Sequence, residues 1–120
     1  MSWDISLTDR ITGKTLCIDS PHYMGGGTRI MGGTRELWLN ITYNYSKIYR
    51  REDVFGKDGI EVIYGKTGLE SIPILENAIA ALGNDVTENY WDATEGNAKR
   101  SLIQLLTMAH MRPDGVWKGD

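Results

Sequence analysis

The first half of the chain alternates apolar and polar residues with a period of two, whereas the second half repeats apolar residues every three or four positions. The first pattern is typical of strands with one buried face, and the second is typical of amphipathic helices. Strands that come before helices, rather than alternating with them, favour an antiparallel sheet packed against helices. We therefore expect an α+β fold, in which an antiparallel sheet from the N-terminal half is covered by two main helices from the C-terminal half.

The two alternating segments nearest the N-terminus, 3–8 and 14–19, are joined by the turn sequence DRITG. Alternation on both sides of a glycine-containing turn predicts a β-hairpin. Cys17 falls on the apolar face of the second segment, which predicts a buried and unreactive thiol.

The richest strand signal is RELWLNITYNYSKIY at 35–49, which has many β-branched and aromatic residues and no Gly or Pro. Alternation along this segment predicts one buried face and one face in contact with solvent. Trp38 is the one large aromatic residue on the solvent face. We expect the buried face to carry Leu37, Leu39, Ile41, Tyr43 and Tyr45, and the solvent face to carry Glu36, Trp38, Asn40, Thr42 and Asn44.

Three helices are predicted in the second half. The spacing of apolar residues in 59–65 fits either a helical turn or a strand, and we expect a short helix with Asp58 as its N-cap and Gly65 at its end. The next covers 66–83, where Thr67 and Glu70 have the spacing of a capping box. The last lies within 94–115, begins at Thr94, and places Arg100, Gln104, Thr107 and Met111 on its outer face. The aromatic pair Tyr90–Trp91 falls in the 84–93 loop, and we expect Trp117 to lie back on the body of the protein.

Length and composition restrict the class of protein. A chain of 120 residues, 41% hydrophobic and 24% charged, suits a single globular domain over 1–120. The net charge of −3 disfavours duplex nucleic acid and anionic membranes as partners. The polar N-terminus and the absence of a long apolar run predict a cytoplasmic protein without signal peptide or membrane span. One cysteine and two histidines without paired spacing predict neither a disulfide nor a metal site, and no cofactor is expected.

The segment MGGGTRIMGGTR at 24–35, which we call the glycine phrase, contains two nearly identical repeats, MGGGTR and MGGTR. Glycines let a backbone form an anion-binding nest, and Arg29 and Arg35 suit phosphate or carboxylate. The alternative is a pair of turns between strands, with Met24 and Met31 as hydrophobic anchors, and glycine-rich stretches favour this interpretation. The GKT at 65–67 is not a phosphate loop, because the required glycine five positions earlier is replaced by Ile60.

The aromatic content points to a binding surface. Tyr and Trp are preferred over Phe where one edge of the ring contacts water or a partner. No serine, cysteine or carboxylate stands in a recognisable relation to His22, so no catalytic residue is assigned. We expect Arg29, Arg35, Trp38 and Asn40 to converge beside the glycine phrase, with the 90–97 segment as the next candidate. The complete candidate binding set is His22, Arg29, Arg35, Glu36, Trp38, Asn40, Asn44, Tyr90, Trp91 and Asn97.

Three segments, GGTRELWLNITYNYS (32–46), IYGKTGLESIPILENAI (63–79) and the region from YWDATEGNAKRSL to MRPDGVWKGD (90–120), resemble a group of small hypothetical proteins of bacteriophages, prophages and other mobile elements. The resemblance covers most of the chain beyond residue 20 and brings no catalytic residue with it. It implies an accessory protein in the cytoplasm of a bacterial host.

These observations lead to three alternative hypotheses for the function. The first is non-catalytic binding to a host protein or protein complex, such as a component of a defence system. The second is sequestration of a small anionic ligand such as a nucleotide. The third, which has the least support, is a small enzyme that uses His22 and the arginines.

Overall fold

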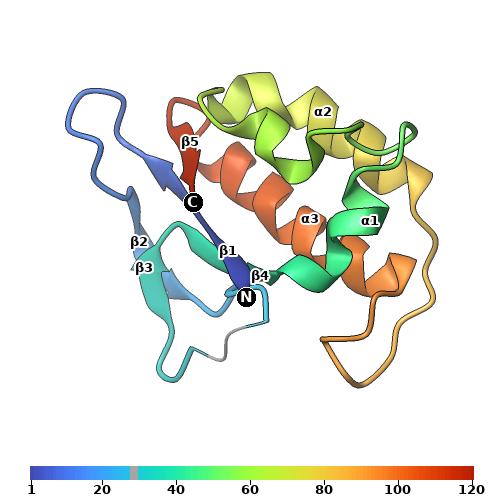
Figure 1. Ribbon diagram of the computed structural model, residues 1–120. Helices are drawn as coiled ribbons and strands as arrows, with labels where there is room; N and C mark the ends of the chain where they lie inside the picture. The colour runs from blue at the N-terminus through green and yellow to red at the C-terminus, as the bar shows by residue number, and fades with distance from the viewer. Residues whose placement is uncertain (28–29) are drawn as a thin grey trace.

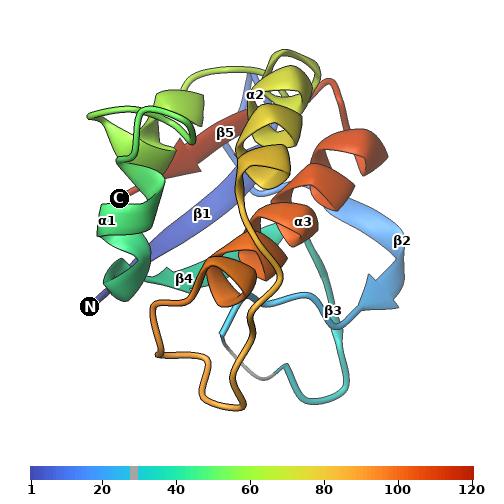
Figure 2. The same cartoon turned by 90° about the vertical axis from the view of Figure 1, so that its right-hand side faces the viewer.

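The computed structural model describes residues 1–27 and 30–120, and its strands come mainly from the first half of the chain (Figure 1). Strands β1 (Ser2–Thr8), β4 (Trp38–Thr42) and β5 (Val116–Gly119) form an antiparallel sheet in the order β4-β1-β5. Helices α2 (Gly68–Ala81) and α3 (Glu95–Met111) lie across one face of this sheet (Figure 2). The predicted α+β class is confirmed, but the last strand comes from the C-terminal end, where no strand was expected.

A second sheet is formed by β2 (Cys17–His22) and β3 (Thr34–Glu36), which lie away from α2 and α3 (Figure 1). The predicted hairpin between 3–8 and 14–19 is therefore only partly correct. Its turn exists, and Thr8 is bridged to Thr15, but β2 then leaves β1 and pairs with β3. The physical reason is competition, because β4 and β5 occupy the two edges of β1. Cys17 is exposed, so the prediction of a buried thiol was wrong.

The predicted strand at 35–49 is correct only in its first half. It is interrupted at Leu37, continues as β4 and ends at Thr42, where the chain enters a 3-10 turn, Tyr43–Tyr45, and the short helix α1, Ser46–Tyr49. The Thr42 hydroxyl accepts a hydrogen bond from the Asn44 N–H at 3.2 Å, which caps the turn and stops the strand. Leu39 and Ile41 are buried as expected, but Thr42 is buried as well and not in contact with solvent.

The predicted helix starts are confirmed. Thr67 and Glu70 form the capping box of α2, and the Thr94 hydroxyl accepts the Asn97 N–H at the start of α3. The short helix near 59–65 is a 3-10 helix, Gly59–Ile63. Trp117 is a buried residue of β5 and donates its indole N–H to the Ser71 hydroxyl at 2.8 Å.

Short segments cover both outer edges of the three-stranded sheet. On β5, the Gly65 N–H bonds to the Trp117 carbonyl, and the Trp117 N–H bonds to the Lys66 carbonyl. On β4, the Asn40 N–H bonds to the Gly25 carbonyl and the Gly27 N–H bonds to the Asn40 carbonyl, at 3.1 and 3.0 Å. These bonds satisfy main-chain groups that an open edge would expose.

The two halves of the glycine phrase therefore have different roles. The first glycine run, 25–27, lies against β4. Gly26 has a φ of 71°, and a Cβ added to it would fall 2.0 Å from the Asn40 carbonyl oxygen. The second run, Gly32 and Gly33, turns the chain into β3 with φ values of 78° and 79°. The turn interpretation is correct for the second run. Of the two predicted anchors, Met24 packs against the core, whereas Met31 is exposed.

Alanine substitutions at Gly26 and Gly32 test this division, since both residues have a positive φ but only Gly26 is enclosed. Gly32→Ala is expected to cost about 1–2 kcal/mol of unfolding free energy, from backbone strain alone. Gly26→Ala adds a steric clash with β4 and is expected to cost about 1–3 kcal/mol more. Urea denaturation of both variants measures the difference, and equal losses would contradict the close packing on β4.

Candidate functional site

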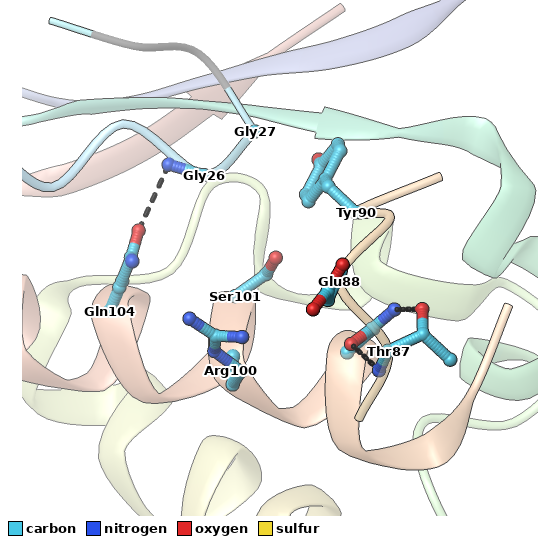
Figure 3. A pocket seen from close by; sticks show the side chains of 9 residues that line it. Gly26, Gly27, Thr87, Glu88, Tyr90, Arg100, Ser101 and Gln104 are labelled. Atoms are coloured by element: carbon cyan, nitrogen blue, oxygen red, sulfur yellow. Dashed lines mark hydrogen bonds between the residues drawn. The ribbon is translucent and has the colours of Figure 1, made fainter. Parts of the chain in front are cut away.

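A cleft of about 200 Å³ lies between the first glycine run, the 84–93 loop and the N-terminal half of α3 (Figure 3). The glycine backbone forms one wall and the loop residues Thr87, Glu88 and Tyr90 form another. Helix α3 supplies the remaining lining residues. They are Asn97, Arg100, Ser101 and Gln104.

Tyr90 joins the loop to the sheet. Its hydroxyl accepts a hydrogen bond from the Thr42 N–H at 2.8 Å and donates to the Asn40 carbonyl at 3.2 Å. Its own carbonyl accepts the hydroxyl of buried Tyr45. Burial raises the pKa of Tyr90, and the bond from the Thr42 N–H partly offsets this effect. The ring also packs against Gly27, where an added Cβ would lie 2.0 Å from the Tyr90 Cε1 atom.

Asn97 holds the loop in its shape. Its side chain is inside the fold, with 4% of the residue exposed. The amide oxygen accepts the Thr87 N–H at 3.2 Å, and the amide nitrogen lies 3.0–3.1 Å from the Thr87 hydroxyl and from the Asn89 and Asp92 carbonyls. Asn97 was predicted to contact a ligand, but these bonds give it a positioning role.

Arg100, Glu88 and Gln104 line the cleft with side-chain groups of different charge. Arg100 and Glu88 make no side-chain hydrogen bond or ion pair with the residues that the structure describes. Gln104 uses its side-chain oxygen to accept the Gly26 N–H at 2.9 Å. The cleft thus offers a guanidinium, a carboxylate and an amide nitrogen to a polar ligand.

His22 has a structural role in the β2–β3 sheet. It is buried, its Nδ1 atom accepts the Met24 N–H at 3.1 Å, and its Nε2 atom lies 2.6 Å from the Glu36 carbonyl. Because Nδ1 accepts a hydrogen bond, the proton is on Nε2, which donates to Glu36. Both ring nitrogens are therefore used within the fold, and the predicted binding role of His22 is not supported by its position.

The predicted convergence beside the glycine phrase does not describe this cleft. Arg35 and Glu36 are exposed on β3, and neither these two nor Trp38 and Asn40 line it. The Asn40 amide instead donates to the Ser2 hydroxyl and the Asp4 carboxylate at 2.7 and 2.9 Å. Arg29 lies outside the described residues.

The candidate residues Tyr90 and Trp91 of the 84–93 loop contact each other, and Asn44 binds the loop beside them. Trp91 is 55% exposed, and its ring meets the Tyr90 ring edge-on, with the ring centroids 5.3 Å apart. Exposed Asn44 donates its amide N–H to the Trp91 carbonyl at 3.0 Å. Asn44, Tyr90 and Trp91 thus form one connected group, of which only Tyr90 lines the cleft.

Sequence reasoning missed Arg100, Gln104 and Glu88 as site residues. The sequence does place Arg100 and Gln104 one helical turn apart on the predicted outer face of α3, which indicates that the two side chains lie close together. What the pattern lacks is the long-range information that residues 26–27 lie over this helix face.

Comparisons with protein-family models, curated proteins and solved structures give no match to this chain. Within residues 1–27 and 30–120, no group of three His, Cys, Asp or Glu side chains is placed to hold a metal ion. No helix in these ranges combines the length and the apolar character that crossing a membrane requires.

Replacing Tyr90 with phenylalanine tests how the loop is attached. The Tyr90→Phe variant keeps the ring but leaves the buried Thr42 N–H without its acceptor, which is expected to cost about 1–3 kcal/mol of unfolding free energy. Tyr23→Phe is the matched control, because Tyr23 is exposed, and it is expected to change stability by less than about 0.5 kcal/mol. Urea denaturation compares the two, and similar small losses would show that the Tyr90 hydroxyl does not secure the loop.

Proposed function

We propose that this chain is a non-catalytic binding protein that docks a protein of a bacterial host, such as a component of a defence system. The proposed contact is the Trp91 surface, which we define as the exposed side chains of Val86 and Trp91 on the 84–93 loop. The observation that supports it is an exposed tryptophan on a loop whose backbone is held in place by hydrogen bonds. The bacterial host is inferred from the resemblance to phage and prophage proteins.

The loop is ordered without regular secondary structure of its own. Asn97 of α3, together with Asn44 and Tyr45 of the 3-10 turn, binds its backbone from two other elements of the fold. A surface that is already ordered loses little conformational entropy when it binds, so a larger part of the contact energy becomes affinity. This arrangement favours a preformed docking surface over a loop that folds around its partner.

The residue type also supports the proposal. Tryptophan, tyrosine and arginine are enriched among the residues that contribute most to protein–protein binding. Trp91 is accompanied by exposed Val86 in the same loop and by Arg100 at the neighbouring cleft. Exposed Leu69 on α2 is an isolated apolar residue of a kind that is normal on a protein surface, whereas exposed Tyr23 and Met31 line a separate hollow with Ile30 and Gly32.

The Trp91→Ala variant tests the docking surface. Wild-type protein is used to isolate a partner from bacterial lysate, and the affinity of the purified partner is then measured by titration calorimetry. Trp91→Ala is expected to weaken binding by about 30-fold, the effect of losing a residue that contributes about 2 kcal/mol.

Leu69→Ala is the matched control. Leu69 is 65% exposed and lies at the start of α2, beside the Pro113 carbonyl and away from the loop. Its replacement is expected to leave the affinity and the melting temperature unchanged. If both variants bind the partner like the wild type, the Trp91 surface is not the docking site.

A further inference from the structure

From the geometry of the cleft we infer a second binding function, a site for a small zwitterion of amino-acid size. The ligand would carry an acidic group toward Arg100 and a protonated amine toward Glu88. This site does not depend on the proposed docking function, because neither Val86 nor Trp91 lines the cleft.

The acidic group is recognised by α3. Arg100 and Gln104 lie one turn apart on the helix wall of the cleft (Figure 3). The Gln104 oxygen is held by the Gly26 N–H at 2.9 Å, which fixes the orientation of the amide group. Its nitrogen donates to no acceptor among the described residues, and neither does the Arg100 guanidinium. Together these groups supply several N–H donors for a carboxylate.

The amine is recognised by the loop wall. Figure 3 shows Glu88 across the cleft from the side on which Arg100 and Gln104 lie. These two charged side chains do not form an ion pair with each other. A ligand with only negative charge would be attracted by Arg100 and repelled by Glu88. A zwitterion satisfies both groups, which distinguishes it from phosphate or a simple carboxylic acid.

The size of the cleft supports a small ligand. Its volume of about 200 Å³ is below the roughly 300–1,000 Å³ that is usual for pockets that hold drug-sized molecules. A whole nucleotide is therefore a poor fit. Ser101, the neighbour of Arg100 on α3, is only 2% exposed and adds a hydroxyl to the helix wall of the cleft. The Tyr90 ring adds an aromatic surface beside Glu88 (Figure 3).

The test is titration calorimetry and thermal unfolding with each standard amino acid, in parallel with acetate, inorganic phosphate and butylamine. We expect at least one amino acid to bind and to raise the melting temperature, whereas the probes that carry a single charge have little effect. Arg100→Gln and Glu88→Gln are each expected to weaken that binding by about tenfold or more, the loss of one charge-assisted contact. Arg35→Gln is the matched control, because exposed Arg35 lies on β3 outside the cleft, and it is expected to bind like the wild type.

Three results would overturn the inference. The first is that no amino acid binds. The second is that phosphate or acetate binds as tightly as any amino acid and binds more tightly to Glu88→Gln, which would show a simple anion site. The third is that Arg100→Gln and Arg35→Gln behave alike, which would show a general solute effect. None of these results bears on the docking function, which the Trp91→Ala variant tests separately.

Discussion

Three backbone hydrogen bonds among Leu7, Leu16 and Leu37 determine how the rest of the chain is arranged. The Leu7 N–H bonds to the Leu37 carbonyl, the Leu37 N–H to the Leu16 carbonyl and the Leu16 N–H to the Leu7 carbonyl, all at 2.8–2.9 Å. The three side chains are buried at this junction. Here the chain that follows β1 leaves it for β3, so that β4 becomes the neighbour of β1. Residues 25–27, which follow β2, then lie along the outer edge of β4, and Gly26 and Gly27 form one wall of the cleft.

The glycines that cover that edge also form one wall of the cleft. Only a segment without side chains can place its backbone against both the Asn40 carbonyl and the Tyr90 ring. Gly26 and Gly27 also line the cleft, together with residues of α3. The residues that cover the sheet edge therefore form one wall of the polar cleft as well.

Local patterns predicted the parts of the fold that depend on neighbours in sequence. The capping box of Thr67 and Glu70, the N-cap at Thr94 and the buried phase of Leu39 and Ile41 are all decided within a few residues. Strand pairing is decided by competition over the whole chain, so the partners of β1 and the strand around Trp117 were missed. The same difference between local and long-range information applies to the residues of the candidate site. Tyr90, which lines the cleft, was proposed from its type and its place in a loop, whereas the place of Arg100 in the cleft depends on a glycine segment more than seventy residues away in the sequence.

The shared loop raises the question of whether the cleft and the Trp91 surface influence each other. Two sites are coupled when one ligand orders or moves an element that the other must bind. In this protein the buried Asn97 amide already fixes the loop through its contacts to Thr87, Asn89 and Asp92. Little ordering is left for a ligand to supply, and Glu88 reaches the cleft from a backbone that is fixed on both sides. The structure therefore favours independent filling of the two proposed sites, because the loop that they share is rigid.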